Sequence, residues 1–295
     1  MNTTLFTGAG VAIVTPFNSD GTINFDKFGE LIERQIENQT DAIIVCGTTG
    51  ESAAMSHEDH ISCIDYCVKK VADRVPVIAG SGSNDTEYAI KLSKSAESLG
   101  ANGLLCVTPY YNKTSQRGLI KHYLMIADAV NIPIILYNVP SRTGLNINPE
   151  TCKVLSEHKN IVAIKEASGN LSQVAKIMAL CGDDFAVYSG NDDIIVPILA
   201  MGGKGVISVM SNVCPQETRK MCQLFFDGKV AESAKMQIHY MELVDALFMD
   251  VNPIPCKDAM NLMGMNVGEC KMPLVCMDEA NIQKLKVVLG NYNLI

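Results

Sequence analysis

Short apolar runs alternate along the chain with longer segments in which apolar residues recur every three or four positions. The runs have the length and the Val, Ile and Leu content of buried strands, and each ends in small or polar residues. Eight strands are predicted, over Val11–Thr15, Ala42–Cys46, Pro76–Gly80, Gly103–Thr108, Ile134–Asn138, Ile161–Glu166, Phe185–Ser189 and Gly205–Val209. Their alternation with helices indicates an α/β protein with a parallel sheet.

The segments between the strands have the periodicity of crossover helices. The clearest of them are Asp26–Gln39, His57–Val71, Thr86–Leu99, Gln116–Val130 and Leu171–Leu180. Ser56, Asp85 and Asn170 stand directly before three of these segments, and such residues favour helix starts because their side chains bind free backbone N–H groups.

Eight strand and helix units joined by right-handed crossovers favour closure into a (β/α)8 TIM barrel over an open doubly wound sheet. An open sheet that binds a dinucleotide would carry a glycine-rich turn after its first strand, but residues 14–18 contain no glycine. We therefore expect a catalytic barrel over residues 1–228.

Further helical patterns follow the eighth unit. Glu232–Met249 is predicted to be one continuous helix, followed by a proline-rich break and by helices over Lys257–Met263 and Asp278–Leu289. Residues 229–295 are therefore expected to form a small C-terminal helical domain.

Composition narrows the classes of function. The 295 residues are 47% hydrophobic and carry a net charge of −8 without basic clusters, so neither nucleic acid nor an anionic membrane is expected as a partner. The 11 cysteines form no C-x-x-C pair, and many stand inside apolar runs, such as Cys46 and Cys106. Buried thiols of this kind are typical of a reducing cytosol. The first 25 residues contain no Lys or Arg, so we expect neither a signal peptide nor a membrane anchor, and a cytoplasmic location.

Lys165 is the most informative residue at the carboxyl ends of the predicted strands, where TIM barrels build their active sites. It ends an apolar strand, so it is expected at the barrel mouth, where loss of water disfavours a charged ammonium. A neutral amine can attack a ketone and form a Schiff base. The alternative is a lysine that reaches past the strand end into solvent, and Lys165 alone does not decide between the two.

Three further features indicate an active site only if they lie close to Lys165 in the fold. Tyr137 ends the preceding strand and could move protons in the same cavity, or it could belong to the core. The turn Gly47–Glu51 contains Thr48 and Thr49 and could bind a small carboxylate, or it could be an ordinary strand-to-helix turn. Arg142 could hold a second carboxylate or remain solvated.

Metal chemistry has little support in the sequence. The five histidines are dispersed, and His57 with His60 supplies only half of a ligand set. Gly202–Gly205 is an incomplete phosphate loop and is predicted to be a tight turn. No metal site is therefore expected.

Taken together, four segments resemble the pyruvate-dependent lyase family, which includes dihydrodipicolinate synthase and N-acetylneuraminate lyase. They are Gly47–Ser52, Tyr110–Asn112, Tyr137–Pro140 and Ile164–Glu166, and they match in order and spacing over nearly the whole chain. The resemblance implies a TIM barrel and a Schiff-base-forming lyase. Because the lysine itself serves as electron sink in such an enzyme, the resemblance implies no metal and no organic cofactor.

The resemblance also implies roles for single residues. Catalysis falls to Lys165, which forms the imine with pyruvate, and to a proton relay of Tyr137, Thr48 and Tyr111. Substrate binding falls to Thr49, the Ile207 backbone, Gly190 and Arg142.

Residues 140–144 resemble the synthase branch of the family, in which the arginine holds the carboxylate of L-aspartate 4-semialdehyde. The implied reaction condenses pyruvate with this aldehyde to 4-hydroxy-tetrahydrodipicolinate, in lysine and diaminopimelate biosynthesis. The alternatives are a sibling aldolase that acts on a sugar acid, such as N-acetylneuraminate or a 2-keto-3-deoxy sugar acid, and a silent barrel that senses a small carboxylate.

Two statements about assembly and control follow from the resemblance. In the family Tyr111 reaches into the active site of a neighbouring subunit, which implies a homo-oligomer, expected to be a tetramer built as a dimer of dimers. Inhibited members bind lysine through positions that match Ser52, Ala53, His57, His60, Asn84, Tyr88 and Tyr110. Because Tyr88 stands where those members have a glutamate, the ammonium of lysine loses its charge partner, and we expect weak or absent lysine inhibition.

Overall fold

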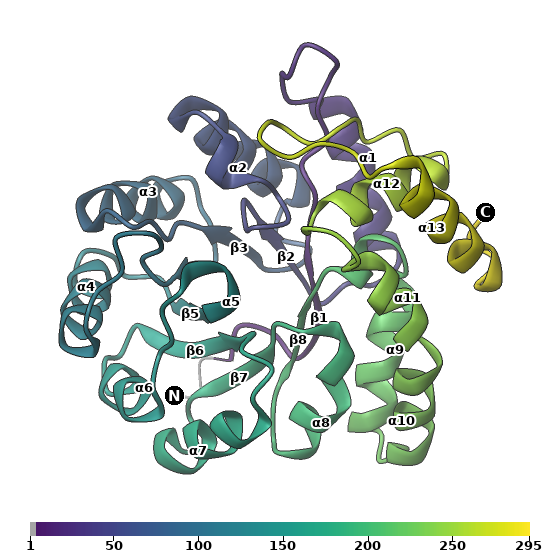
Figure 1. Cartoon of the computed structure of the whole chain (residues 1–295). Coiled ribbons are helices and arrows are strands. Elements are labelled where there is room, and N and C mark those ends of the chain that lie inside the picture. Colours follow the sequence, from purple (N-terminus) through teal and green to yellow (C-terminus); the bar gives the residue numbers. More distant parts are fainter. Residues whose placement is uncertain (1–3) are drawn as a thin grey trace.

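Eight parallel strands close into a barrel in the computed structural model, which describes residues 4–295 (Figure 1). The strands are β1 (Gly8–Ala12), β2 (Ala42–Val45), β3 (Val77–Gly80), β4 (Gly103–Val107), β5 (Ile134–Asn138), β6 (Ile161–Glu166), β7 (Ala186–Ser189) and β8 (Gly205–Ser208). Each strand pairs with its neighbours in chain order, and β1 closes the circle by pairing with β8. The predicted TIM barrel is confirmed.

The first strand departs most from its predicted limits, whereas the others match fully or differ by one residue at one end. It spans Gly8–Ala12 and not Val11–Thr15. The apolar run continues past the strand because the connection that follows is also buried: the Val14 N–H donates to the side chain of Asn212, and the Thr15 hydroxyl donates to the carbonyl oxygen of Gly50. A buried connection therefore has the same apolar pattern as a strand.

Helices surround the barrel in a single outer layer (Figure 1). They are α1 (Phe25–Glu37), α2 (His57–Val71), α3 (Thr86–Ser98), α4 (Gln116–Asp128), α6 (Pro149–Ser156), α7 (Leu171–Cys181), α8 (Ile195–Ala200) and α9 (Pro215–Phe226), with the four-residue α5 (Pro140–Thr143) in the loop after β5. The side chains of Ser56, Asp85 and Asn170 each accept a backbone N–H from the first turn of α2, α3 and α7, as the sequence indicates.

Four more helices follow the barrel, and the first of them packs against α9 (Figure 1). They are α10 (Val230–His239), α11 (Met241–Leu247), α12 (Ile254–Leu262) and α13 (Glu279–Asn291). The predicted continuous helix over Glu232–Met249 is wrong, because Tyr240 interrupts it and stacks its ring on that of Tyr292. The predicted start of α12 at Lys257 is also wrong, because Pro255 lies in the first turn, where a proline is tolerated. The division into two domains after residue 228 stays a prediction.

Apolar side chains fill the inside of the barrel. Phe6 and Tyr188 stack there with ring centroids 4.4 Å apart, and the Tyr188 hydroxyl donates to the Phe6 carbonyl oxygen at 2.7 Å. The barrel is therefore a packed core and not a pore, and its open cavities lie among the loops at the carboxyl ends of the strands.

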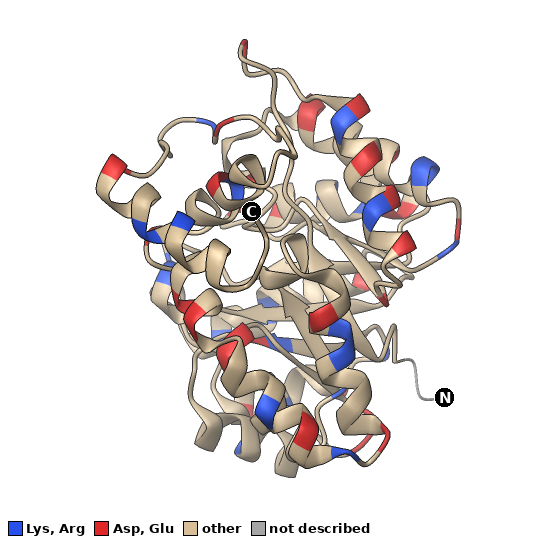
Figure 2. Ribbon diagram, turned by 90° about the vertical axis from the view of Figure 1, so that its right-hand side faces the viewer, with Lys and Arg blue, Asp and Glu red and all other residues tan. Residues whose placement is uncertain are grey.

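Acidic and basic residues intermingle along the helices in the view of Figure 2. Among residues 4–295, no helix has the length and hydropathy needed to cross a membrane.

Candidate active site

Lys165 and Tyr137 are direct neighbours across two adjacent strands. Lys165 on β6 pairs in register with Tyr137 on β5, and its Nζ lies 4.4 Å from the centroid of the Tyr137 ring. Their side chains are 5% and 6% exposed. The register shifts by one residue between Ile134 and Ile135, and this irregularity places Lys165 opposite Tyr137. An amine and a phenol therefore meet in one place that is largely shielded from bulk solvent.

A cavity of about 300 Å³ opens onto this pair. Its wall consists mainly of loop residues that follow β5, β6 and β7, and α11, the turn after β2, the loop after β8 and the segment before α12 complete it. They include Thr49, Arg142, Ala167, Gly190, Asn191, Asp192 and Asn252. A cavity of this size suits one or two small organic acids.

Gly190 allows the wall of the cavity to approach Lys165 closely. A Cβ atom at position 190 would lie 2.6 Å from the Ala167 Cβ and 3.0 Å from the Lys165 Cε. Only a residue without a side chain fits there unless Lys165 moves, so Gly190 shapes the space around the amine.

Asn252 joins two of the predicted substrate-binding residues. Its side-chain amide donates to the Thr49 hydroxyl at 3.0 Å, and its backbone carbonyl accepts from the Arg142 guanidinium at 3.0 Å. Asn252 is 5% exposed and lies in the wall of the cavity. In the sequence Asn252 stands out only as part of the helix break before Pro253, and this proline-rich segment gives no pattern that would mark a substrate-binding residue.

Asp192 is a buried carboxyl group in the same wall. One oxygen accepts the backbone N–H groups of Val209 and Met210, both at 2.9 Å. Burial raises the pKa of Asp192. Smaller opposing effects, which lower this pKa, come from the Ser208 hydroxyl, the same two N–H groups and the charge of Lys165. The sequence places Asp192 at a strand end but does not assign it a role.

The remaining predicted catalytic residues do not meet within one chain. Tyr111 is 92% exposed and lines neither cavity. Thr48 lies in the wall of a second cavity, but no side-chain hydrogen bond links it to Tyr137 or Tyr111 in the part of the chain that the structure describes. Ile207 is fully buried inside the barrel, in the same apolar cluster as Tyr137. A relay from Tyr137 through Thr48 to Tyr111 is thus not assembled in this single chain.

The second cavity holds about 580 Å³ and shares Tyr137, Val139, Arg142 and Asn252 with the first. Most of the predicted effector positions lie in its wall: Ser52, Ala53, His60, Tyr88 and Tyr110. The other two positions, His57 and Asn84, are outside this wall. The His57 Nδ1 lies 3.4 Å from the Tyr88 hydroxyl, and the Asn84 carbonyl oxygen accepts from the side-chain amide of Asn112.

The two histidines of this region have structural partners. The Nε2 of His60 lies 2.8 Å from the Gly80 carbonyl oxygen, and burial lowers the pKa of His60. Within residues 4–295, no three His, Cys, Asp or Glu side chains are grouped as metal ligands would be.

Comparisons with known proteins give one consistent picture. The family model described as "Dihydrodipicolinate synthetase family" matches residues 5–291. A 4-hydroxy-tetrahydrodipicolinate synthase from Acetivibrio thermocellus is 57% identical over 295 residues and is covered in full, as is this chain.

Solved structures agree with the sequence relatives. A DHDPS from Cyanidioschyzon merolae with lysine bound has a TM-score of 0.96 at 41% identity, with 99% of each chain covered. The chloride-inhibited dihydrodipicolinate synthase from Acinetobacter baumannii, complexed with pyruvate, has a TM-score of 0.95 at 37% identity, covering 98% of this chain and 99% of that one.

Proposed function

Because the chain belongs to the dihydrodipicolinate synthetase family, we propose that Lys165 forms a Schiff base with pyruvate and that the resulting enamine attacks L-aspartate 4-semialdehyde. The reaction is that of a 4-hydroxy-tetrahydrodipicolinate synthase, a Schiff-base-forming lyase in lysine and diaminopimelate biosynthesis. The observation that carries the assignment of roles is the buried Lys165 amine beside the Tyr137 ring.

The chemistry needs one nucleophile and a proton carrier. The Lys165 amine adds to the keto carbon of pyruvate, and loss of water leaves an iminium. Loss of a methyl proton gives the enamine, whose carbon bonds to the aldehyde carbon of the second substrate. The amino group of that substrate then displaces Lys165 and closes the ring. The ring of Tyr137 lies beside the Lys165 amine, and we assign the proton transfers to the hydroxyl of Tyr137.

Two carboxylates have to be held for this sequence of steps. We assign the pyruvate carboxylate to the Thr49 hydroxyl and the Ile207 backbone, and the carboxylate of the aldehyde to Arg142, with Gly190 leaving room beside the amine. Asn252 supports the assignment because it holds Thr49 and Arg142 at fixed positions relative to each other.

The experiment that tests this function is reductive trapping. Borohydride added with pyruvate should fix a pyruvate-sized mass on the peptide that contains Lys165, and Lys165→Ala should gain none. A Lys165→Ala variant that forms product at the parent's rate would refute the mechanism. Faster cleavage of N-acetylneuraminate or of a keto-deoxy sugar acid than condensation with L-aspartate 4-semialdehyde would instead establish a sibling aldolase.

We infer that the protein works as a homo-oligomer, a tetramer built as a dimer of dimers. The argument is the 92% exposure of Tyr111, which lies outside both cavities of its own chain and can join a relay only from a second copy. Such a copy would place the Tyr111 hydroxyl beside Thr48, which lies in the wall of the larger cavity.

Complementation tests the shared site. Tyr111→Phe and Lys165→Ala chains, each inactive alone, should regain about a quarter of the parental activity when they are refolded together in equal amounts, because half of the mixed dimers' sites combine an intact lysine with an intact tyrosine. No recovery, with mixed oligomers shown by mass spectrometry, would place Tyr111 in its own chain's site or outside the mechanism.

We also propose a cytosolic location. All 11 cysteines have free thiols, and most of these are buried, as is usual for proteins of a reducing compartment.

A further inference from the structure

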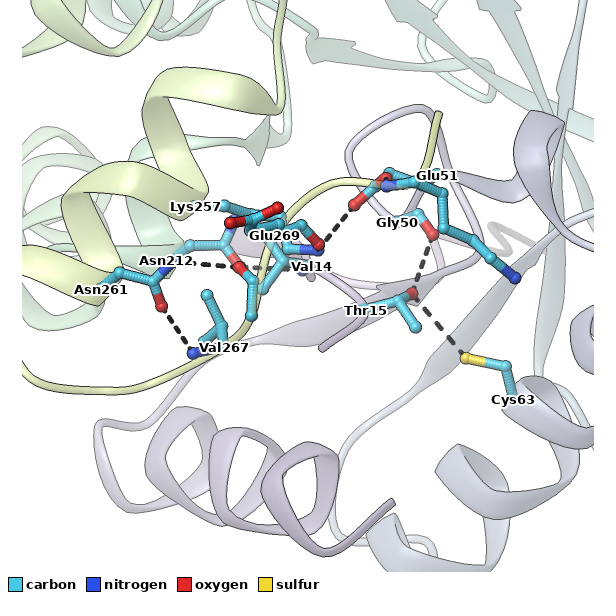
Figure 3. Close-up of polar contacts among 12 residues, drawn as sticks. Val14, Thr15, Gly50, Glu51, Cys63, Asn212, Lys257, Asn261, Val267 and Glu269 are labelled. Carbon is cyan, nitrogen blue, oxygen red and sulfur yellow. Dashed lines mark hydrogen bonds and ion pairs between the residues drawn. The ribbon is translucent and has the colours of Figure 1, made fainter. Parts of the chain in front are cut away.

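A buried ion pair joins the turn after β2 to the first turn of α12. The Nζ of Lys257 lies 2.8 Å from the Oε1 of Glu51, and the two side chains are 1% and 0% exposed (Figure 3). The two residues are 206 positions apart in the sequence. Neither belongs to the cavity around Lys165, although Glu51 lies in the wall of the larger cavity, and the mechanism above gives neither charge a function.

The surroundings fix both charged groups rigidly. Lys257 also donates to the Glu269 carbonyl oxygen at 2.8 Å and lies 4.4 Å from the centroid of the Phe17 ring. The second oxygen of Glu51 accepts the backbone N–H of Lys271 at 2.7 Å. Each charge therefore has several partners, which is what a pair without water needs in order to persist.

Stability alone is a weak reason for such a pair. Moving two charges out of water costs several kcal/mol per ion, and apolar residues of the same size often replace a buried pair without loss of stability. A buried pair is better explained where it specifies one arrangement of two segments.

The two segments that the pair joins are both part of the site. Glu51 follows Thr49 by two residues, and its backbone N–H donates to the Thr48 carbonyl oxygen at 3.0 Å within the same turn. On the other side, α12 begins two residues after Asn252, whose side chain donates to Thr49. The ion pair and this hydrogen bond thus connect the same turn to the same end of α12, one outside the cavity and one in its wall.

We propose that Lys257 is a positioning residue for the reaction. Its ion pair with Glu51 holds the Thr48–Glu51 turn against the start of α12, so that Asn252 keeps the Thr49 hydroxyl directed at the pyruvate carboxylate. The proposal rests on the proposed function, because it takes Thr49 to be a ligand of pyruvate. Misplacement of a positioned group by about 1 Å can cost on the order of 100-fold in rate, so a pair outside the cavity can control binding and turnover.

Three variants separate positioning from support of the fold. Lys257→Met removes the cation and keeps most of the side-chain volume. Glu51→Gln combined with Lys257→Met removes both charges, so that no unpaired charge is buried, and the amide oxygen that replaces the carboxylate can still accept from the Lys271 N–H. Lys271→Met is the matched control, because the Lys271 Nζ lies 5.1 Å from the centroid of the same Phe17 ring but contacts Asp59 and not the Glu51 side chain.

The readout is the Michaelis constant for pyruvate, with kcat, the rate of borohydride trapping and the melting temperature measured on the same oligomers. We expect the Michaelis constant to rise about 10-fold or more in Lys257→Met and in the double variant, with kcat lowered less, and to stay within about 2-fold of the parent in Lys271→Met. The defect should persist in the double variant even where its melting temperature matches the parent's.

Two results would overturn the proposal. One is a double variant that binds and traps pyruvate like the parent, and the other is a kinetic change of the same size in Lys271→Met. If the single variant fails to fold, the double variant decides by itself, because it buries no lone charge. A parent enzyme that does not trap pyruvate at all would refute the proposed function instead, so the two failures are distinguishable.

Discussion

The Nζ of Lys165 faces the ring of Tyr137 at 4.4 Å from its centroid, across the paired strands β5 and β6. The ring and the hydroxyl of Tyr137 therefore have separable effects. The ring contacts the amine and packs in the barrel interior, whereas the hydroxyl has no hydrogen-bond partner within the described chain and is available for proton transfer.

Tyr137→Phe should retain the fold and lose turnover. The ring is kept and no internal hydrogen bond is removed, so the free energy of unfolding should change by less than about 1 kcal/mol. Loss of a positioned proton carrier should lower kcat by roughly 100-fold to 10,000-fold. Steady-state kinetics and urea unfolding test the two halves. A Phe variant with the parental kcat would remove Tyr137 from the mechanism.

Gly190→Ala should disturb the Lys165 side chain. The added methyl would meet the Ala167 Cβ at 2.6 Å and the Lys165 Cε at 3.0 Å, so the amine has to move, and we expect kcat/KM to fall by roughly 10-fold to 100-fold. Gly290→Ala is the control, since nothing lies within 4 Å of its added Cβ on helix α13. It should leave kcat/KM unchanged and stabilise the helix by up to about 1 kcal/mol. Equal kinetics for both variants would show that Lys165 tolerates the methyl.

Tyr88→Glu should introduce or strengthen inhibition by lysine. Tyr88 lies in the wall of the larger cavity, and by the family resemblance it replaces the carboxylate that binds the effector's ammonium. A charged hydrogen bond contributes about 1.5–3 kcal/mol, which is more than 10-fold in affinity. We expect little inhibition of the parent at millimolar lysine and a clearly lower half-inhibiting concentration for the variant. Half-inhibition of the parent below millimolar lysine would contradict the argument.

Protonation of His122 in the unfolded chain should lower the free energy of unfolding in mild acid. Burial lowers the pKa of His122 to about 4, and its Nδ1 lies 2.9 Å from the Thr86 hydroxyl. The unfolded chain takes up a proton at this residue near its ordinary pKa of about 6.5, whereas the folded chain does so only near 4. The free energy of unfolding therefore falls between these two pH values, by at most about 3 kcal/mol, and not further below them.

The variant His122→Gln isolates this contribution from that of the carboxyl groups. Between pH 7 and pH 5, the parent should lose roughly 2 kcal/mol more of its unfolding free energy than the variant does. Urea unfolding at both pH values measures the difference. Parallel losses in the two proteins would mean that His122 takes up its proton in the folded state as readily as in the unfolded chain.

The meeting of Lys165 and Tyr137 was predictable because both end apolar runs of consecutive strands, and the ends of parallel strands gather at one face of a barrel. The same reasoning reaches Thr49, Arg142 and Gly190, each of which follows a strand. Their geometry is visible in the structure, and their roles stay predictions.

The links through Asn252 and Lys257 were not predictable. Their partners Thr49 and Glu51 lie more than 200 positions earlier in the sequence, and no local pattern encodes a contact at that separation. Tyr240 is a similar case, since neither glycine nor proline marks the helix end, and its contact with Tyr292 forms only in the folded chain. Local periodicity specifies elements, whereas these contacts depend on how the C-terminal helices lie against the barrel.

Closure of the barrel has a consequence for how copies of the chain can associate. Because β1 pairs with β8, the eight strands leave no unpaired row of N–H and C=O groups that another strand could extend. Association of two chains therefore cannot proceed by adding strands to this sheet and has to use the surfaces of helices and loops. The protein is in this respect protected against ribbon-like aggregation, while its loops remain free to form specific contacts.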